Sequence, residues 1–282
     1  MSKQAKIKII VAVVLAVLTG ICICFGCFML IRENRLNNIQ QTAISELDAN
    51  AGRYDESSIV LKNTSPSAAS ALAEKYGAEL RITHDGSFAT LNLPVETTIR
   101  DIFADRNNRE DIPYMSADYM VETADVVVGE EGDGSARPIP VAPEYNVTDE
   151  LYEYQSYLDY LNIGRTWNNY RGEGITVAVI DTGIDTDHPE FAGRISEYSY
   201  NATEDKILKD YDWSVIEDEV GHGTAVAGTV GAAMDGVGVV GIAPEVELLI
   251  IKAECSPNGT FYRASDLVFG MYYAIERDAD II

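Results

Sequence analysis

The chain has 282 residues and a formal net charge of −24, with 45 acidic against 21 basic side chains. Its hydrophobic content of 46% is sufficient for the cores of one large or two modest domains. The acidic excess would repel a phosphate backbone, which argues against nucleic acid as a partner. Three of the four cysteines lie within residues 22–27, so the sequence predicts no disulfide framework, and it contains no Cys/His cluster that would indicate zinc.

The first part of the chain, residues 1–31, contains an uncharged apolar segment that begins at Ile9 and follows three lysines. The segment is long enough to cross a bilayer as a helix, and the lysines favour a cytoplasmic start. We therefore predict a signal anchor over residues 1–31 and a single-pass cell membrane protein whose part after Arg32 is extracytoplasmic. A cleaved signal peptide that releases a secreted protein, or a lipid-modified Cys27, is an alternative.

Residues 32–57 are polar with scattered apolar side chains, which predicts a juxtamembrane stalk. In residues 58–128, strand and helix patterns follow one another in the order β-α-β-β-α-β. The predicted strands are residues 58–62, 79–83, 87–93 and 114–121, and the predicted helices are residues 68–76 and 97–103. This order is typical of a ferredoxin-like α+β domain. Residues 129–145 are rich in acid, Gly and Pro and predict an exposed linker.

A buried strand is predicted from Ile175, where an apolar run rich in β-branched residues ends in Asp-Thr-Gly. The preceding residues, 146–174, predict a helix followed by a Gly-marked turn. Asp181 then lies at the carboxyl end of the strand, where sites form in open α/β sheets. By itself, an Asp at this position could be only a turn former or a helix N-cap.

A histidine lies between two glycines in residues 221–228, at the start of a helical run of small residues. Such a helix can pack close to the sheet, so we expect His222 and Asp181 to face one crevice. An Asp that hydrogen-bonds Nδ1 of a His leaves Nε2 free to take a proton from a hydroxyl, which is two thirds of a Ser-His-Asp triad. A lone His beside Gly is often a turn residue, but the two motifs together favour the catalytic interpretation.

The two motifs, VIDTGID and HGTAVAG, resemble those of the subtilisin-like serine proteases (subtilases). The subtilase patterns are V-I-D-[ST]-G-[IV]-[DN] and H-G-T-x-V-A-G, and the resemblance continues from GIAP at residues 241–244 to the last residue. It implies that Asp181 orients His222, and that His222 is the general base of a serine endopeptidase that hydrolyses peptide bonds. Ala225 stands where many members have a second His, and Val220 where many have a polar residue. The resemblance therefore does not predict the surface that faces the substrate.

The resemblance also implies an architecture. Residues 146–282 would be the N-terminal part of a subtilase catalytic domain, a truncated doubly wound parallel sheet of the α/β class. The ferredoxin-like residues 58–128 would be an inhibitory propeptide whose tail enters the active site, with maturation cleavage within residues 129–145. The implied partners are a peptide or protein substrate and the chain's own propeptide. A generic small α+β domain is the alternative for residues 58–128.

No cofactor is required for this chemistry, but structural calcium is common among subtilases. Glu190, in HPEF, stands where such enzymes often have a carboxylate ligand. Asp235, in MDGVGVVG, lies in the partner loop, whose carbonyl groups would supply further oxygens. Turn formation by Asp-Gly is the competing interpretation for Asp235. The metal prediction is limited to these two calcium candidates.

The subtilase nucleophile lies in G-T-S-[MA]-A well after the His, and this chain has no such motif. Only Ser256, in a predicted loop, and Ser265, at a helix start where an N-cap role is ordinary, follow His222. We therefore predict a fragment of serine endopeptidase lineage that is inactive as it stands. One alternative is a non-enzymatic, membrane-anchored inhibitor or binding remnant. Another is an aspartic protease, which would need a symmetric dimer because Asp-Thr-Gly occurs once.

Overall fold

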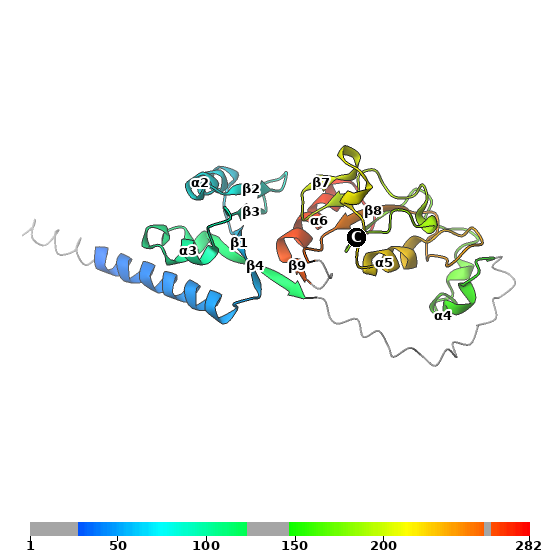
Figure 1. The fold of residues 1–282 in the computed structure, drawn as a ribbon, viewed down its shortest axis with the longest axis horizontal. Coiled ribbons are helices and arrows are strands. Elements are labelled where there is room, and N and C mark those ends of the chain that lie inside the picture. Colours follow the sequence, from blue (N-terminus) through cyan, green and yellow to red (C-terminus); the bar gives the residue numbers. More distant parts are fainter. Residues whose placement is uncertain (1–27, 123–146, 257–260) are drawn as a thin grey trace, which may run out of the picture. The chain divides into compact units, whose positions relative to one another are not determined.

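The computed structural model describes residues 28–122, 147–256 and 261–282. The chain separates into two compact units, Met1–Ala117 and Asp118–Ile282, which we call unit 1 and unit 2 (Figure 1). The predicted linker and maturation segment lies outside the described residues.

Unit 1 contains a sheet with the strand order β2-β3-β1-β4, in which β3 pairs antiparallel with both β1 and β2. The strands are β1 (Tyr54–Leu61), β2 (Glu79–Ile82), β3 (Ala89–Asn92) and β4 (Met115–Glu122), and the helices are α2 (Pro66–Tyr76) and α3 (Ile99–Ala104). The last residues of β4 belong to unit 2. The chain order is β-α-β-β-α-β, the ferredoxin-like order that the sequence predicts.

Local signals start α2 and α3 and stop α2. Ser65 caps α2, because its Oγ accepts a hydrogen bond from the amide of Ala68, and Gly77 ends the helix in the left-handed conformation with φ 60°. Thr98 and Asp101 form a capping box at the start of α3. These signals depend on neighbouring residues only, which explains why sequence patterns locate both helices.

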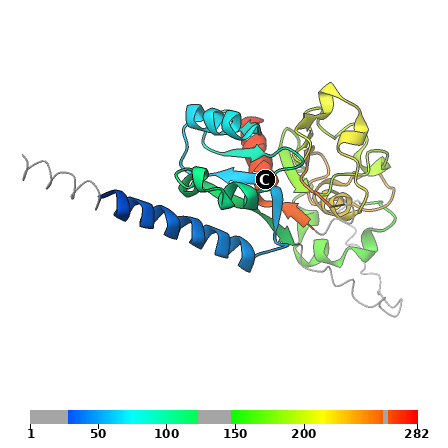
Figure 2. The ribbon, with the colours of Figure 1, turned by 60° about the vertical axis from the view of Figure 1, so that its left-hand side comes forward.

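A further helix of unit 1 covers residues 28–49 and runs beside α3 (Figure 2). Gln40 is buried and its amide donates to the carbonyl oxygen of Phe103 over 2.8 Å, and Leu47 is only 2% exposed. Gln40 and Leu47 are two helical turns apart and therefore share one face. The helix is packed into unit 1, which differs from the separate stalk predicted for residues 32–57.

Among the residues that the structure describes, no helix is both long and apolar enough to cross a membrane. Residues 28–31, the end of the predicted membrane span, form the first turn of the helix that packs on α3 and continues into charged residues. The rest of the predicted anchor, residues 1–27, lies outside the described residues. The structure therefore gives no support to the predicted transmembrane helix.

Unit 2 is organised around a sheet with the strand order β5-β8-β6-β7. β5 (Thr176–Asp181) and β8 (Glu247–Lys252) are parallel and paired along their whole length. β6 (Tyr200–Asn201) is parallel to β8, and β7 (Lys206–Ile207) is antiparallel to β6. The two long strands are almost entirely apolar because both of their faces are covered.

Helices cover opposite faces of this sheet, which is the doubly wound arrangement (Figure 1). Successive residues of a strand point to opposite faces, so alternate side chains of β5 and β8 enter two different cores. The core that includes α5 (His222–Gly231) contains Val177, Val179, Leu248 and Ile250. The core that includes α6 (Ala264–Glu276) contains Ala178, Leu249 and Ile251. The α/β class predicted for this part of the chain is confirmed.

Two shorter elements, α4 and β9, also belong to unit 2. The lead-in to β5 contains α4 (Ser156–Tyr160), which is shorter than the predicted helix. β9 (Phe261–Arg263) precedes α6 and pairs antiparallel with residues 120–122 at the end of β4.

Candidate active site

The structure brings Asp181 and His222 together. Asp181 is the last residue of β5, and His222 is the first residue of α5. Nδ1 of His222 lies 2.6 Å from Oδ1 of Asp181, which is hydrogen-bond distance. The side chain of Asp181 is 12% exposed and that of His222 is 44% exposed. The carboxylate is therefore shielded, and the imidazole ring is the part of the pair that other groups can reach.

Two glycines allow the turn after β5 to lie against residues 216–217 and against the start of α5. Gly183 has φ +117°, and a Cβ added there would lie 2.5 Å from the carbonyl oxygen of Ile216. A Cβ on Gly223 would lie 2.3 Å from the carbonyl oxygen of Gly183. Neither position accepts a side chain unless the backbone moves. Because Gly183 follows Asp181 by two residues and Gly223 follows His222 directly, this close approach brings the pair within bonding distance.

A further carboxylate, Asp218, joins the same two segments. Its Oδ1 accepts hydrogen bonds from Thr182 Oγ1 (2.8 Å) and from the amides of Val220 (3.0 Å) and Gly221 (2.8 Å). Its Oδ2 accepts from the amide (2.9 Å) and the hydroxyl (2.6 Å) of Thr224. Burial by itself would raise the pKa of Asp218, but the hydrogen bonds outweigh burial and lower the pKa to about 2.

Asp218 and Thr182 also serve as the cap of α5. The N-cap residue of this helix is Gly221, which has no side chain to accept a hydrogen bond. Thr182 Oγ1 accepts from the amide of Gly223 over 2.8 Å, and Asp218 accepts from the amide of Thr224. The first amides of a helix have no partner within the helix, so they need such acceptors. Sequence reasoning missed both residues, although an Asp three positions before the N-cap is a usable signal.

The calcium candidates Glu190 and Asp235 are both bonded to backbone amides of residues 237–239, in the loop that follows α5. Glu190 is 4% exposed, and its Oε1 accepts from the amide of Val239 over 3.0 Å. Oδ1 of Asp235 accepts from the amide of Val237 over 3.1 Å, as the competing turn interpretation predicts. Burial raises the pKa of Glu190 above its ordinary range.

A third carboxylate, Asp149, borders this loop and was missed by sequence reasoning. Its Oδ1 accepts from the amide of Asp235 over 3.1 Å. Asp149 Oδ2 and Glu190 Oε2 are buried and have no hydrogen-bond partner among the described residues, so both would be open to a cation. Within those residues, however, no three His, Cys, Asp or Glu side chains are grouped to hold a metal ion. Calcium binding at Glu190 and Asp235 stays a prediction.

The two serines that follow the predicted general base have other partners. Ser265 is 4% exposed, and its hydroxyl donates to Oδ2 of Asp118 over 2.5 Å. Its amide donates to Oδ1 of Asp118 over 3.1 Å, so a residue of β4 caps α6. The predicted N-cap role of Ser265 is wrong, because the helix begins at Ala264 and its N-cap position is Arg263, two residues before Ser265. The hydroxyl of Ser256 accepts from the amide of Phe261 over 3.1 Å.

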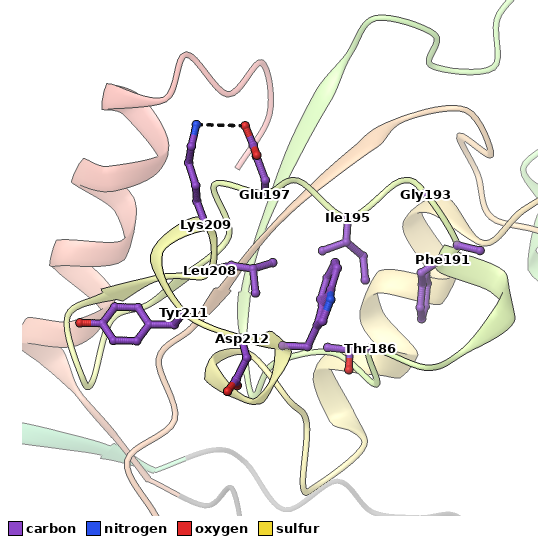
Figure 3. A pocket seen from close by; sticks show the side chains of 11 residues that line it. Thr186, Phe191, Gly193, Ile195, Glu197, Leu208, Lys209, Tyr211 and Asp212 are labelled. Carbon is purple, nitrogen blue, oxygen red and sulfur yellow. Dashed lines mark hydrogen bonds and ion pairs between the residues drawn. The ribbon is translucent and has the colours of Figure 1, made fainter.

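A pocket of about 450 Å³ lies on unit 2, and neither member of the Asp–His pair lines it (Figure 3). Its lining includes the apolar side chains of Phe191, Leu208 and Trp213. Lys209 and Glu197 form an ion pair of 3.2 Å beside it, and both side chains are exposed, so the pair adds little stability. No predicted site residue lines this pocket.

Fold and geometry together define a doubly wound α/β protein with an Asp–His pair at the carboxyl end of its first long parallel strand. Residues 172–282 match the model of a family described as the subtilase family. This region, which contains Asp181 and His222, is therefore similar to the subtilase family, as the motifs around the two residues indicate.

Named relatives agree with this assignment. The chain is 46% identical over 121 residues to the intracellular serine protease of Paenibacillus polymyxa, a match that covers 41% of this chain and 34% of that protein. It is 35% identical over 150 residues to the major intracellular serine protease of Bacillus subtilis (strain 168), which covers 53% of this chain and 45% of that protein. The chain thus spans less than half the length of these relatives.

A solved structure supports the fold. Fervidolysin from Fervidobacterium pennivorans, described as a keratinolytic enzyme related to subtilisin, superposes with a TM-score of 0.59 at 20% identity. The superposition covers 82% of this chain and 36% of that chain, so it extends well beyond residues 172–282. The α/β fold of unit 2 is therefore subtilisin-like.

The predicted localisation, a single-pass membrane protein with an extracytoplasmic catalytic part, is wrong. The relatives from Paenibacillus polymyxa and Bacillus subtilis are named intracellular serine proteases, and no helix of the described residues is able to span a membrane. The prediction relied on the length of an apolar run, but residues 28–31 of that run belong to a helix that continues into charged residues. The predicted membrane partner is accordingly not supported by the described residues.

The lowered pKa of Asp218 predicts a pH-dependent stability. A carboxyl whose pKa is lower in the folded chain stabilises the fold above its ordinary pKa of 3.8, and this contribution is lost as the pH falls toward 2. We expect Asp218→Asn to lower the free energy of unfolding by about 1 kcal/mol near neutral pH, after allowance for solvent screening. Urea unfolding should show this difference shrinking below about pH 4. A difference that stays constant down to about pH 2 would contradict the assignment.

Proposed function

We propose that residues 146–282 supply the Asp and the His of a subtilisin-like serine endopeptidase, in which Asp181 orients His222 and His222 is the general base. The 2.6 Å contact between His222 Nδ1 and Asp181 Oδ1 supports this proposal most directly. With Nδ1 held by the carboxylate, Nε2 is the nitrogen that takes the proton of a serine hydroxyl and returns it to the leaving amine. The carboxylate stabilises the imidazolium formed in between. The substrate is a peptide or protein.

We propose further that the 282 residues by themselves do not hydrolyse peptides. A nucleophile must lie within hydrogen-bond reach of its base, whereas the hydroxyl of Ser265 is buried on Asp118. In subtilisin, loss of the serine nucleophile alone lowers kcat by about 10⁶.

Residues 58–128 are proposed to act as an inhibitory propeptide, and two contacts within unit 2 support this role. Residues 120–122 pair antiparallel with β9, as an extended peptide does when it adds to the edge of a strand. Asp118, two residues earlier, places its carboxylate on the amide and hydroxyl of Ser265 at the start of α6. A segment held at both points would occupy the edge of β9 in place of a peptide substrate.

The activity proposal predicts that a fluorophosphonate probe does not label the 282-residue chain. A chain extended by the residues encoded after codon 282 should be labelled if that frame encodes Gly-Thr-Ser-Met-Ala. Its kcat should fall by about 10⁴ to 10⁶ in Asp181→Asn and His222→Ala. Labelling of the 282-residue chain that disappears in Ser256→Ala or Ser265→Ala would reveal an overlooked nucleophile. Undiminished activity of the extended His222→Ala chain would refute the proposed base.

The propeptide proposal predicts inhibition in trans. A segment of residues 28–128, which includes the helix packed on α3, should inhibit subtilisin E at micromolar concentration and leave chymotrypsin active. Asp118→Ala should weaken inhibition about tenfold, because it removes a charge-assisted pair of hydrogen bonds worth about 1.4 kcal/mol. Glu96→Ala, at an exposed turn, is the matched control and should inhibit like the unchanged segment. Full subtilisin E activity in excess segment would rule out the propeptide role.

A further inference from the structure

Asp218 bonds to the neighbour of each member of the Asp–His pair. Thr182, which donates to Asp218 Oδ1, directly follows Asp181. Gly221, whose amide donates to the same oxygen, directly precedes His222. The carboxylate therefore connects the two chain segments at the residues that carry the pair, although none of its hydrogen bonds within the described residues reaches the imidazole itself.

Backbone contacts alone hold the two segments near one another. The amide of Ile184 donates to the carbonyl oxygen of Ile216 over 2.9 Å, and the amide of Asp218 donates to the carbonyl oxygen of Ile184 over 3.1 Å. These bonds lie before the helix begins, so they leave the direction of its first turn open. The side chains of Asp218 and Thr182 fix this direction, because they accept hydrogen bonds from the amides of Thr224 and Gly223 within the first turn.

Thr224 provides a second connection between the turn after β5 and the first turn of α5. Its hydroxyl donates to Asp218 Oδ2 over 2.6 Å and accepts from the amide of Asp185 over 2.9 Å. The turn after β5 is therefore bonded to the first turn of α5 through two hydroxyl groups, and both hydroxyl groups donate to the same carboxylate. A hydroxyl that donates to Asp218 is also held in the orientation in which its lone pairs face the backbone amides.

We propose that Asp218 is a positioning residue, whose ionised carboxylate fixes the first turn of α5 on the turn after β5 and thereby keeps His222 Nδ1 on Asp181. The inference rests on the proposed role of Asp181 and His222, and it adds a residue that does not touch the reacting groups. All five partners of the carboxylate are donors, so both oxygens must be acceptors. An Asn offers one acceptor oxygen, and its NH₂ group would face donors.

The test uses the full chain labelled with ¹⁵N at its three histidines. The proton shared by His222 Nδ1 and Asp181 should give a low-field signal that His222→Ala removes, which assigns it. We expect Asp218→Asn to abolish this signal. Thr182→Val, which removes one hydroxyl of the connection and keeps the side-chain shape, should abolish or strongly broaden it. Amide exchange in α5 and circular dichroism report in parallel whether the fold persists.

Two control variants separate positioning from a general effect on stability. Thr224→Ser keeps its hydroxyl and should keep the signal. Asp212→Asn removes another carboxylate that accepts from an amide and a hydroxyl in a turn, those of Ser214, and should also keep the signal. If Asp218→Asn does not fold, the folded Thr182→Val variant decides the question.

The outcomes distinguish this inference from the proposed function. A folded Asp218→Asn or Thr182→Val chain that retains the wild-type signal would overturn the positioning role and leave the Asp–His pair intact. Absence of the signal in the wild-type chain would instead contradict the hydrogen bond between His222 and Asp181. The proposed general base, and the positioning role that rests on it, would then both fail.

Discussion

The site depends on the contact between the turn that follows β5 and the first turn of α5. Parallel pairing of β5 with β8 fixes the end of the strand. The turn then lies so close to the backbone of Ile216 that Gly183 accepts no Cβ, and α5 lies so close to the turn that Gly223 accepts none. Close approach leaves the first amides of α5 facing the turn, where each needs an acceptor. Thr182 and Asp218 meet this need, so the same contact that brings His222 to Asp181 also half-buries a second carboxylate, which its hydrogen bonds keep ionised.

The packing of α5 and α6 on the two faces of the sheet supports the contact between the turn and α5. Alternating side chains of the two long strands face α5 on one side of the sheet and α6 on the other. Ala227, on the buried side of α5, is fully buried, which allows the helix axis to lie close to the strands. On the other side, α6 begins at Ala264, where Asp118 accepts from the amide of Ser265 next to β9 and the end of β4. The two helix starts are thus both capped by carboxylates from outside the helix, one of them from the proposed inhibitory segment.

Sequence patterns predict those features whose determinants are local. The Asp-Thr-Gly turn and the Gly-His-Gly start of α5 each depend on a few adjacent residues, so their position in the fold could be predicted. Asp118 and Asp149 could not, because their partners lie 147 and 86 residues away and nothing near them in the chain indicates the bond. The helix of residues 28–49 differs from the separate stalk predicted for residues 32–57, which was based on a polar stretch with scattered apolar side chains. Its burial against α3 depends on tertiary contacts such as that of Gln40 with Phe103.

The dependence of the Asp–His pair on this close approach is tested most directly by the distance between His222 Nδ1 and Asp181 Oδ1 in crystal structures of two glycine variants. Gly223→Ala places a Cβ against the backbone of Gly183, whereas Gly228→Ala, in the same helix, meets only Phe191 at 3.9 Å. We expect the distance to exceed about 3.2 Å, beyond a normal hydrogen bond, in Gly223→Ala. It should stay at 2.6 Å in Gly228→Ala. An unchanged distance in both variants would contradict a pair that is positioned by the contact of the turn with α5.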